Sequence, residues 1–354
     1  MFLALREIRH QPTKFALIIS VIALVSYLTF FLAALAQGLA HSYRSSVDDW
    51  RATSIVLTEA SNENVSASRL SQDQVNAVPT SPDTSTLLTT PVVLEDAAGT
   101  KIDASGFGLP EGSFLAPSLV EGEAPTDPSR QVVTDDSLKD EGWQVGQVFT
   151  LTGSDHEWEV TGFAHDQSFQ ALPVVFFQDT ALIDNGPSSV SPTPNAMVSR
   201  EDLSGDQAIA DAGLDVLDSA AFVNTLPGYS AQVLTFSLMI GSLIVIASFV
   251  LGIFIYVLTL QKRPVLGILK ARGVPTRYLI ISGAAQTALL SAVGVALGLT
   301  LTLVSALVLP QAVPFRVDAV MDAAITTAFI VFAVLGGLIS VRVVSRIDPV
   351  EAIS

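Results

Sequence analysis

A long charge-free segment is the most constraining feature of this sequence of 354 residues. Between Ser219 and Gln261, 43 consecutive residues include no Asp, Glu, Lys or Arg, and a basic segment starting at Lys262 follows directly. About 20 apolar residues cross the hydrocarbon core of a bilayer, and clustered Lys and Arg mark the cytoplasmic side. The segment therefore predicts a membrane-spanning helix whose C-terminal end faces the cytoplasm.

Three further charge-free stretches are long enough to span a membrane. They are Phe15–Ala40, Leu279–Phe315 and Ala323–Val341. We therefore expect an α-helical polytopic membrane protein with four transmembrane helices. The expected helices cover residues 13–40, 226–260, 279–310 and 320–343. Four crossings place both termini on the same side of the membrane.

The distribution of charge indicates which side that is. The insert His41–Thr225 holds 7 Lys and Arg against 29 Asp and Glu, a net charge of -22, whereas the rest of the chain has a net charge of +6. Cations that flank the spans stay in the cytoplasm, and long domains are translocated regardless of charge. We therefore expect both termini in the cytoplasm and a large extracytoplasmic domain, residues 41–225, between the first two helices.

Short β-branched or aromatic runs separated by turn residues predict a mixed α/β fold for this outer domain. The expected strands are 54–58, 91–95, 147–152, 157–162 and 173–177. The third and fourth are joined by a short turn that contains Gly153, which predicts a hairpin. Weaker helical patterns cover 71–78 and 201–213. The chain contains no cysteine, so the domain must fold without disulfides.

The N-terminal region allows alternative interpretations. Residues 1–12 carry Phe2, Leu5 and Ile8 on one helical face, which favours an amphipathic interfacial helix over a simple basic flank. A cleaved signal peptide is the rival interpretation of the first span, because Ala34-Leu35-Ala36 resembles a cleavage site. The apolar stretch of 26 residues exceeds the about 7 to 15 of a signal peptide, which favours a retained helix.

The second span is longer than a bilayer requires. A helix from Gly228 to Leu260 would be about 50 Å long, against a hydrocarbon core of about 30 Å. We expect it to continue outside the membrane as a stalk that could transmit mechanical force, and a tilted helix is the alternative. The third span contains a GxxxG motif at Gly294 and Gly298, which predicts close helix packing, most simply within one protomer.

The sequence lacks the patterns of an enzyme. No Gly-Lys pair is followed by Ser or Thr, so the chain has no phosphate loop for nucleotide hydrolysis. Its four histidines lack the spacing of a metal site, and we expect no intrinsic metal or cofactor. The predicted spans also lack the charged residues that couple transport to ions. These absences point to a partner ATPase, and the acidic insert argues against nucleic acid as a partner.

Two segments resemble the cytoplasmic signatures of FtsX-like permeases of the MacB type. The sequence Val-Leu-Gly-Ile-Leu-Lys-Ala-Arg-Gly lies at 265–273, and Asp-Pro-Val-Glu-Ala lies in the cytoplasmic tail, residues 344–354. The resemblance implies that residues 261–278 couple the permease to its ATPase. The residues implied in coupling are Val265, Leu266, Gly267, Leu269, Lys270, Arg272 and Gly273. The chain departs from the family at Pro264-Val265, where an acidic residue is common.

The N-terminal sequence is similar to that of heme-exporter permeases of the HrtB type, close to the DevC-like exporters. The similar residues are 1–10, 25–32, 38–40 and 49–57. The resemblance implies a permease in the bacterial cytoplasmic membrane that exports heme. Its implied partners are two copies of an ABC-type ATPase subunit, a second copy of itself, the lipid bilayer and heme. The alternatives are an FtsX-like regulator of cell-wall hydrolases and a MacB-like exporter of lipoproteins or peptides.

A heme site needs apolar walls, an axial ligand and a polar group near the propionates. The outer halves of the first two helices offer all three. The candidate walls are Phe30, Phe31, Leu35 and Phe236; the candidate ligands are Tyr229, Met239 and His41; the candidate polar partners are Gln232 and Arg44. Structural roles are the alternative for each ligand or partner, such as an interfacial anchor for Tyr229 and helix packing for Met239.

Overall fold

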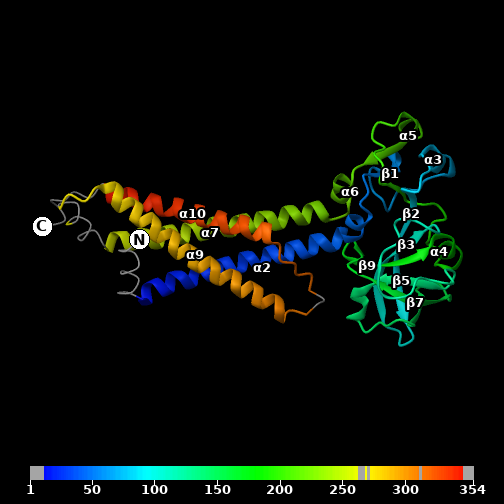
Figure 1. Cartoon of the computed structure of the whole chain (residues 1–354), viewed down its shortest axis with the longest axis horizontal. Coiled ribbons are helices and arrows are strands. Elements are labelled where there is room, and N and C mark those ends of the chain that lie inside the picture. Colours follow the sequence, from blue (N-terminus) through cyan, green and yellow to red (C-terminus); the bar gives the residue numbers. More distant parts are fainter. Residues whose placement is uncertain (1–11, 262–267, 269–271, 311–312, 346–354) are drawn as a thin grey trace. The chain divides into compact units, whose positions relative to one another are not determined.

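The computed structural model describes residues 12–261, 268, 272–310 and 313–345 (Figure 1). The predicted interfacial helix at 1–12 and the cytoplasmic tail therefore lie almost entirely outside the described residues. The chain forms two compact units. One comprises Met1–Gly38 and Leu234–Ser354, and the other comprises Leu39–Val233. We call them the membrane unit and the outer unit.

Four long helices correspond to the four predicted spans. They are α2 (Pro12–Trp50), α7 (Tyr229–Gln261), α9 (Thr276–Val308) and α10 (Ala319–Ser345). Among the described residues, α2, α7 and the stretch Ile280–Val308 are long and apolar enough to cross a membrane, whereas the apolar stretch Ala319–Leu335 of α10 is shorter. The polytopic helical architecture with a large domain after the first helix is therefore present.

Helix α2 is longer than the predicted span 13–40, because it continues to Trp50. An ion pair between Arg44 Nε and Asp48 Oδ2, 3.1 Å apart at i and i+4, supports this extension. Trp50 is 2% exposed in the core of the outer unit, with its ring centroid 6.0 Å from that of Phe107. The helix ends there, since Arg51 has a φ of 52°. Residues 41–50 therefore belong to the outer unit, as predicted, but they continue the first helix.

Helix α7 has the predicted length of 33 residues. It starts directly after Gly228, whose φ of 85° suits glycine. Its exposed side chains are mostly apolar, including Leu234, Leu238 and Phe249. An apolar helix surface of this kind is expected of a lipid-facing or subunit-facing span.

The GxxxG motif of α9 lies against α2. A Cβ atom added to Gly294 would come within 2.6 Å of Ile22 Cγ2, and one added to Gly298 within 2.1 Å of Ser26 Oγ. Ser26 Oγ also donates a hydrogen bond to the carbonyl of Gly294 at 3.3 Å. The predicted close packing within one protomer is therefore confirmed. The small glycines let the two backbones approach, which is how helices associate in lipid.

The outer unit is a mixed α/β domain built on one 11-stranded sheet. Its strands are β1 (Ser54–Thr58), β2 (Thr84–Asp96), β3 (Lys101–Leu109), β4 (Leu119–Gly122), β5 (Gln131–Asp135), β6 (Val148–Leu151), β7 (Glu157–Ala164), β8 (Ser168–Phe169), β9 (Leu172–Gln178), β10 (Ala196–Ser199) and β11 (Leu214–Leu217). The main path runs β11-β1-β10-β2-β3-β9-β5-β7-β4. Its helices are α3 (Gln72–Ala77), α4 (Asp179–Asn185), α5 (Gln207–Asp211) and α6 (Ser219–Thr225), and two 3-10 turns cover Glu59–Ser61 and Asp136–Lys139.

Most predicted elements of this domain are present. The predicted hairpin is the antiparallel pair β6 and β7, with Phe149 opposite Trp158. The helix predicted at 71–78 is α3, which Ser71 and Gln74 close with a capping box. The helix predicted at 201–213 is wrong over its first half, because only Gln207–Asp211 is helical. There Asp206 caps the helix by accepting a hydrogen bond from Ala208 N, so the helix cannot extend upstream.

We predict that Gly298→Ala destabilises the membrane unit by about 1–3 kcal/mol, because the new methyl group overlaps Ser26 Oγ and the backbone of α2. Gly241→Ala on α7 is the matched control, since a Cβ there meets nothing within 4 Å. The control should be neutral or slightly stabilising, as alanine favours helix more than glycine. Thermal unfolding of the purified protein in detergent measures both, and equal stability of the two variants would contradict the packing described.

Candidate functional site

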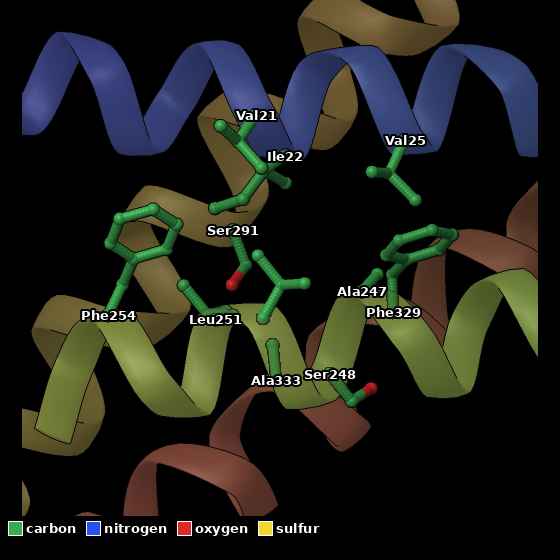
Figure 2. A pocket seen from close by; sticks show the side chains of 11 residues that line it. Val21, Ile22, Val25, Ala247, Ser248, Leu251, Phe254, Ser291, Phe329 and Ala333 are labelled. Carbon is green, nitrogen blue, oxygen red and sulfur yellow. The ribbon is translucent and has the colours of Figure 1, made fainter.

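Side chains from all four helices of the membrane unit converge on one small cavity (Figure 2). Its volume is about 10 Å³. The walls are almost entirely apolar, and they include Ile22, Leu251, Phe254 and Phe329. A site for a small organic ligand usually encloses about 300–1,000 Å³. This cavity therefore cannot hold a planar macrocycle, and it is best described as a packing seam.

One polar group faces this seam without a partner. Ser291 of α9 is 1% exposed, lines the cavity, and its Oγ has no hydrogen-bond partner within the described part of the chain. Ser248 also lines it but donates to the carbonyl of Ile244 at 2.7 Å. A cavity of this size has room for at most about one water molecule. The seam therefore contains a hydroxyl but no charge.

The predicted wall residues of α2 are buried or half-buried. Phe30 is fully buried in the core of the membrane unit. Phe31 is half-buried, with its ring centroid 5.7 Å from that of Tyr27 and 5.2 Å from that of Phe315. Leu35 is also half-buried. These contacts are those of structural packing, so α2 offers less open aromatic surface than the sequence predicted.

Three of the predicted polar or ligating side chains already have neighbours. Tyr229 is 9% exposed and packs on Tyr43, with ring centroids 5.9 Å apart, in the core of the outer unit. His41 Nε2 lies 2.5 Å from Asp166 Oδ2. Arg44 forms the ion pair with Asp48 within α2. A ligand could reach these side chains only by displacing those contacts.

The remaining candidates follow one face of α7. Gln232, Phe236 and Met239 are spaced at i, i+4 and i+7, a spacing that places side chains on one side of a helix. Met239 is 46% exposed and Phe236 is half-buried. The side-chain nitrogen of Gln232 is buried and has no hydrogen-bond partner among the described residues. This face therefore combines a thioether, an aromatic ring and an unused amide donor.

Most predicted coupling residues lie outside the described residues, namely Val265, Leu266, Gly267, Leu269 and Lys270. Arg272 and Gly273 are described and form a turn that precedes α9. Gly273 has a φ of 86°, in the left-handed region that favours glycine. The turn before Pro275, the N-cap of α9, therefore gives a physical reason for a glycine at position 273.

Sequence reasoning missed a group of acidic and histidine side chains in the outer unit. Asp135, at the end of β5, is 3% exposed, and burial raises the pKa of its carboxyl from 3.8 to about 6. His165 Nδ1 lies 2.7 Å from Asp136 Oδ2, and this hydrogen bond raises the pKa of the imidazole. No sequence spacing could have joined these residues, because the sheet brings β5 and the end of β7 together.

The membrane unit matches a known family. Residues 237–349 match the model of the FtsX-like permease C-terminal region. This part of the chain is therefore similar to the C-terminal region of FtsX-like permeases.

Two curated relatives match the chain over its whole length. It is 26% identical over 361 residues to the putative hemin transport system permease protein HrtB of Staphylococcus haemolyticus, covering 100% of this chain and 99% of the relative. It is 25% identical over 366 residues to the protein of the same description in Staphylococcus epidermidis, with the same coverage.

Two solved structures align with part of the chain. The periplasmic region of MacB from Actinobacillus actinomycetemcomitans has a TM-score of 0.36 and 14% identity, covering 49% of this chain and 92% of that structure. The extracellular domain of the ABC-type transporter YknZ from Gram-positive bacteria has a TM-score of 0.32 and 16% identity, with the same two coverages.

Proposed function

We propose that this permease exports heme, or a similarly flat amphipathic molecule, from the bacterial cytoplasmic membrane, driven by a separate ABC-type ATPase. The observation that carries the proposal is the full-length similarity to permeases described as putative hemin transporters. A complex of two permeases and two ATPase subunits follows from the family resemblance. Both termini and the basic segment after α7 face the cytoplasm, and the acidic outer unit faces outward.

The uncharged interior of the membrane unit supports an external source of energy. Among the residues whose burial is described, the core of this unit is apolar, and the polar residues buried there are uncharged, such as Ser26, Thr287 and Ser291. Carriers driven by ion gradients bind the coupling ion with charged groups inside their spans. A permease without such groups needs a partner that converts ATP hydrolysis into helix movement.

The small internal cavity supports a substrate site on the surface of the bundle. Heme is far larger than the seam of about 10 Å³ between the four helices. The face of α7 formed by Gln232, Phe236 and Met239 offers an axial thioether ligand, an aromatic wall and an amide donor for a propionate. Heme dissolved in the lipid could reach such a face laterally. A second copy of the chain would supply the opposite wall.

The first test concerns the heme site. We predict that Met239→Leu, which keeps the size of the side chain but removes its sulfur, weakens heme binding at least tenfold, or about 1.4 kcal/mol. Protein purified from heme-fed membranes is compared by its Soret absorption, and cells by their heme resistance. Leu238→Ala is the control, because Leu238 is an exposed neighbour on the same helix. An unchanged Soret band in Met239→Leu would exclude Met239 as ligand.

The second test concerns coupling. We predict that Leu269→Asp abolishes stimulation of the partner ATPase. An unpaired charge at an apolar contact between the subunits would cost about 3–5 kcal/mol. Leu269→Met is the matched control, as it conserves size and polarity. Both variants must insert in the membrane at wild-type levels. Full ATPase stimulation and heme export by Leu269→Asp would show that this segment does not couple the subunits.

The third test concerns orientation. A cysteine at Ser189, which is exposed in the outer unit, should react with a membrane-impermeant thiol reagent in intact cells. A cysteine at Thr276 should react only after the membrane is permeabilised, because the neighbouring cations stay in the cytoplasm. The chain has no native cysteine, so no background labelling is expected. Labelling of Thr276→Cys in intact cells would reverse the proposed topology.

A further inference from the structure

The end of α2 is fastened to one turn of the outer unit. His41, Ser45 and Asp49 are spaced by four residues and therefore lie on one face of the helix. This face contacts consecutive residues at 166–168, between β7 and β9. Ser45 Oγ accepts a hydrogen bond from Ser168 N at 2.9 Å. The three residues of the helix thus meet three successive residues of the turn.

The other two contacts of this face are also hydrogen-bonded. His41 Nε2 lies 2.5 Å from Asp166 Oδ2. Gln167 Nε2 donates to Asp49 Oδ2 at 3.1 Å. All of these residues belong to the outer unit. The helix that carries them is continuous with the first apolar span.

The turn between β8 and β9 has a strained backbone. Gln170 and Ala171 have φ values of 53° and 63°, the pattern of a two-residue hairpin turn that normally contains Asn and Gly. Both residues carry a side chain, so this left-handed conformation is strained. Their two amides donate to the carbonyls of Tyr43 and Ser42 on α2, at 3.1 and 3.0 Å. These hydrogen bonds to the helix offset the strain.

A buried carboxylate supports the same turn from the sheet. Asp135 accepts hydrogen bonds from Gln167 N at 2.6 Å and from the hydroxyl of Ser137. The titratable groups around this turn come from α2, from the 3-10 turn after β5, and from the turn itself. They are His41 and Asp49, Asp136, and His165 and Asp166. Around this turn, the aspartate carboxyl groups therefore outnumber the two histidines.

We propose that the turn 165–171 is a proton-responsive clasp, which holds the outer end of α2 to the outer domain and closes more tightly as the medium becomes more acidic. The contacts that form it are the three side chains of α2, the two carbonyls of α2 and the buried Asp135. Because α2 continues from the first span, the clasp is one of the points, together with the packing of Trp50 on Phe107, where a movement of that helix would reach the sheet. It does not depend on the identity of the substrate.

The direction in which the clasp responds to pH follows from the raised pKa values of Asp135 and His165. The pKa of Asp135 is raised by burial from 3.8 to about 6, so the closed state binds an extra proton, and its stability rises as the pH falls through about 6. The pKa of His165 is raised by its hydrogen bond to Asp136, so its contribution is present at low pH and is lost as the pH rises through the raised value. Both groups favour closure in acid.

Hydrogen–deuterium exchange of the full-length protein in lipid nanodiscs tests the clasp. The amides of Gln167, Ser168, Gln170 and Ala171 all donate hydrogen bonds within it. After correction for the intrinsic exchange rate, their protection should rise about tenfold or more between pH 8 and pH 5, as expected for a shift of at least one pKa unit. Asp135→Asn, which resembles the protonated carboxyl, should be protected at both pH values and lose most of this dependence.

Variants of two neighbouring serines test whether specific hydrogen bonds, and not packing in general, protect the turn. Ser45→Ala should lower protection of the turn at every pH, whereas Ser46→Ala should not, because the buried Ser46 Oγ has no hydrogen-bond partner among the described residues. If Asp135→Asn fails to fold, Ser137→Ala replaces it and should move the midpoint to higher pH, since it removes a donor to the carboxylate. Protection independent of pH in the wild type, or equal in Ser45→Ala and wild type, would overturn the proposal.

Discussion

The membrane unit depends on close contact between helices whose buried side chains, where the structure describes them, are uncharged. Lipid is as apolar as leucine, so helices in a bilayer gain little from burying apolar side chains and associate through tight packing instead. Gly294 and Gly298 let α9 approach α2 until a single added methyl group would overlap Ser26. The seam between the four helices is consequently almost full, with room for about one water molecule. A heme is far too large for such a seam.

This packing explains why transport should take place at the edge of the bundle and be driven from outside the chain. A tightly packed bundle moves as connected helices, and two of its long helices, α2 and α7, include residues of both units. Force applied at the cytoplasmic ends would therefore travel along rigid elements. The face of α7 around Met239 and the fastening of α2 at residues 165–171 lie on these same two helices, which links the proposed substrate site and the proposed clasp to one mechanism.

The sequence predicted four long helices and the length of α7, because membrane helices need long charge-free runs and few other structures do. It also predicted the hairpin of β6 and β7, whose turn residues are a local signal. It did not predict that α2 continues to Trp50, since the contacts that hold this extension come from residues such as Phe107 and Phe222, far away in the chain. Local polarity alone suggested an end at residue 40.

For the candidate site, too, the sequence indicated the types of residue but not the contacts that they make in the folded chain. Apolar and aromatic side chains at a membrane edge were recognisable from the sequence, but their partners were not. Tyr229 packs on Tyr43 and His41 pairs with Asp166, which requires the folded outer unit. The buried Asp135 left no signal in the sequence, because an aspartate at the end of a strand is usually a solvated turn residue.

The central claim is that ATP hydrolysis by a partner drives heme out of the membrane through this permease. The most direct measurement reconstitutes the permease and its ATPase in liposomes loaded with heme and follows transfer of heme to an apo-globin by the Soret band. Apo-globin is placed on the side of the outer unit. The account predicts transfer that requires hydrolysable ATP and persists when ion gradients are collapsed. Transfer that depends on a proton gradient instead of ATP, or no transfer above that of empty liposomes, would contradict it.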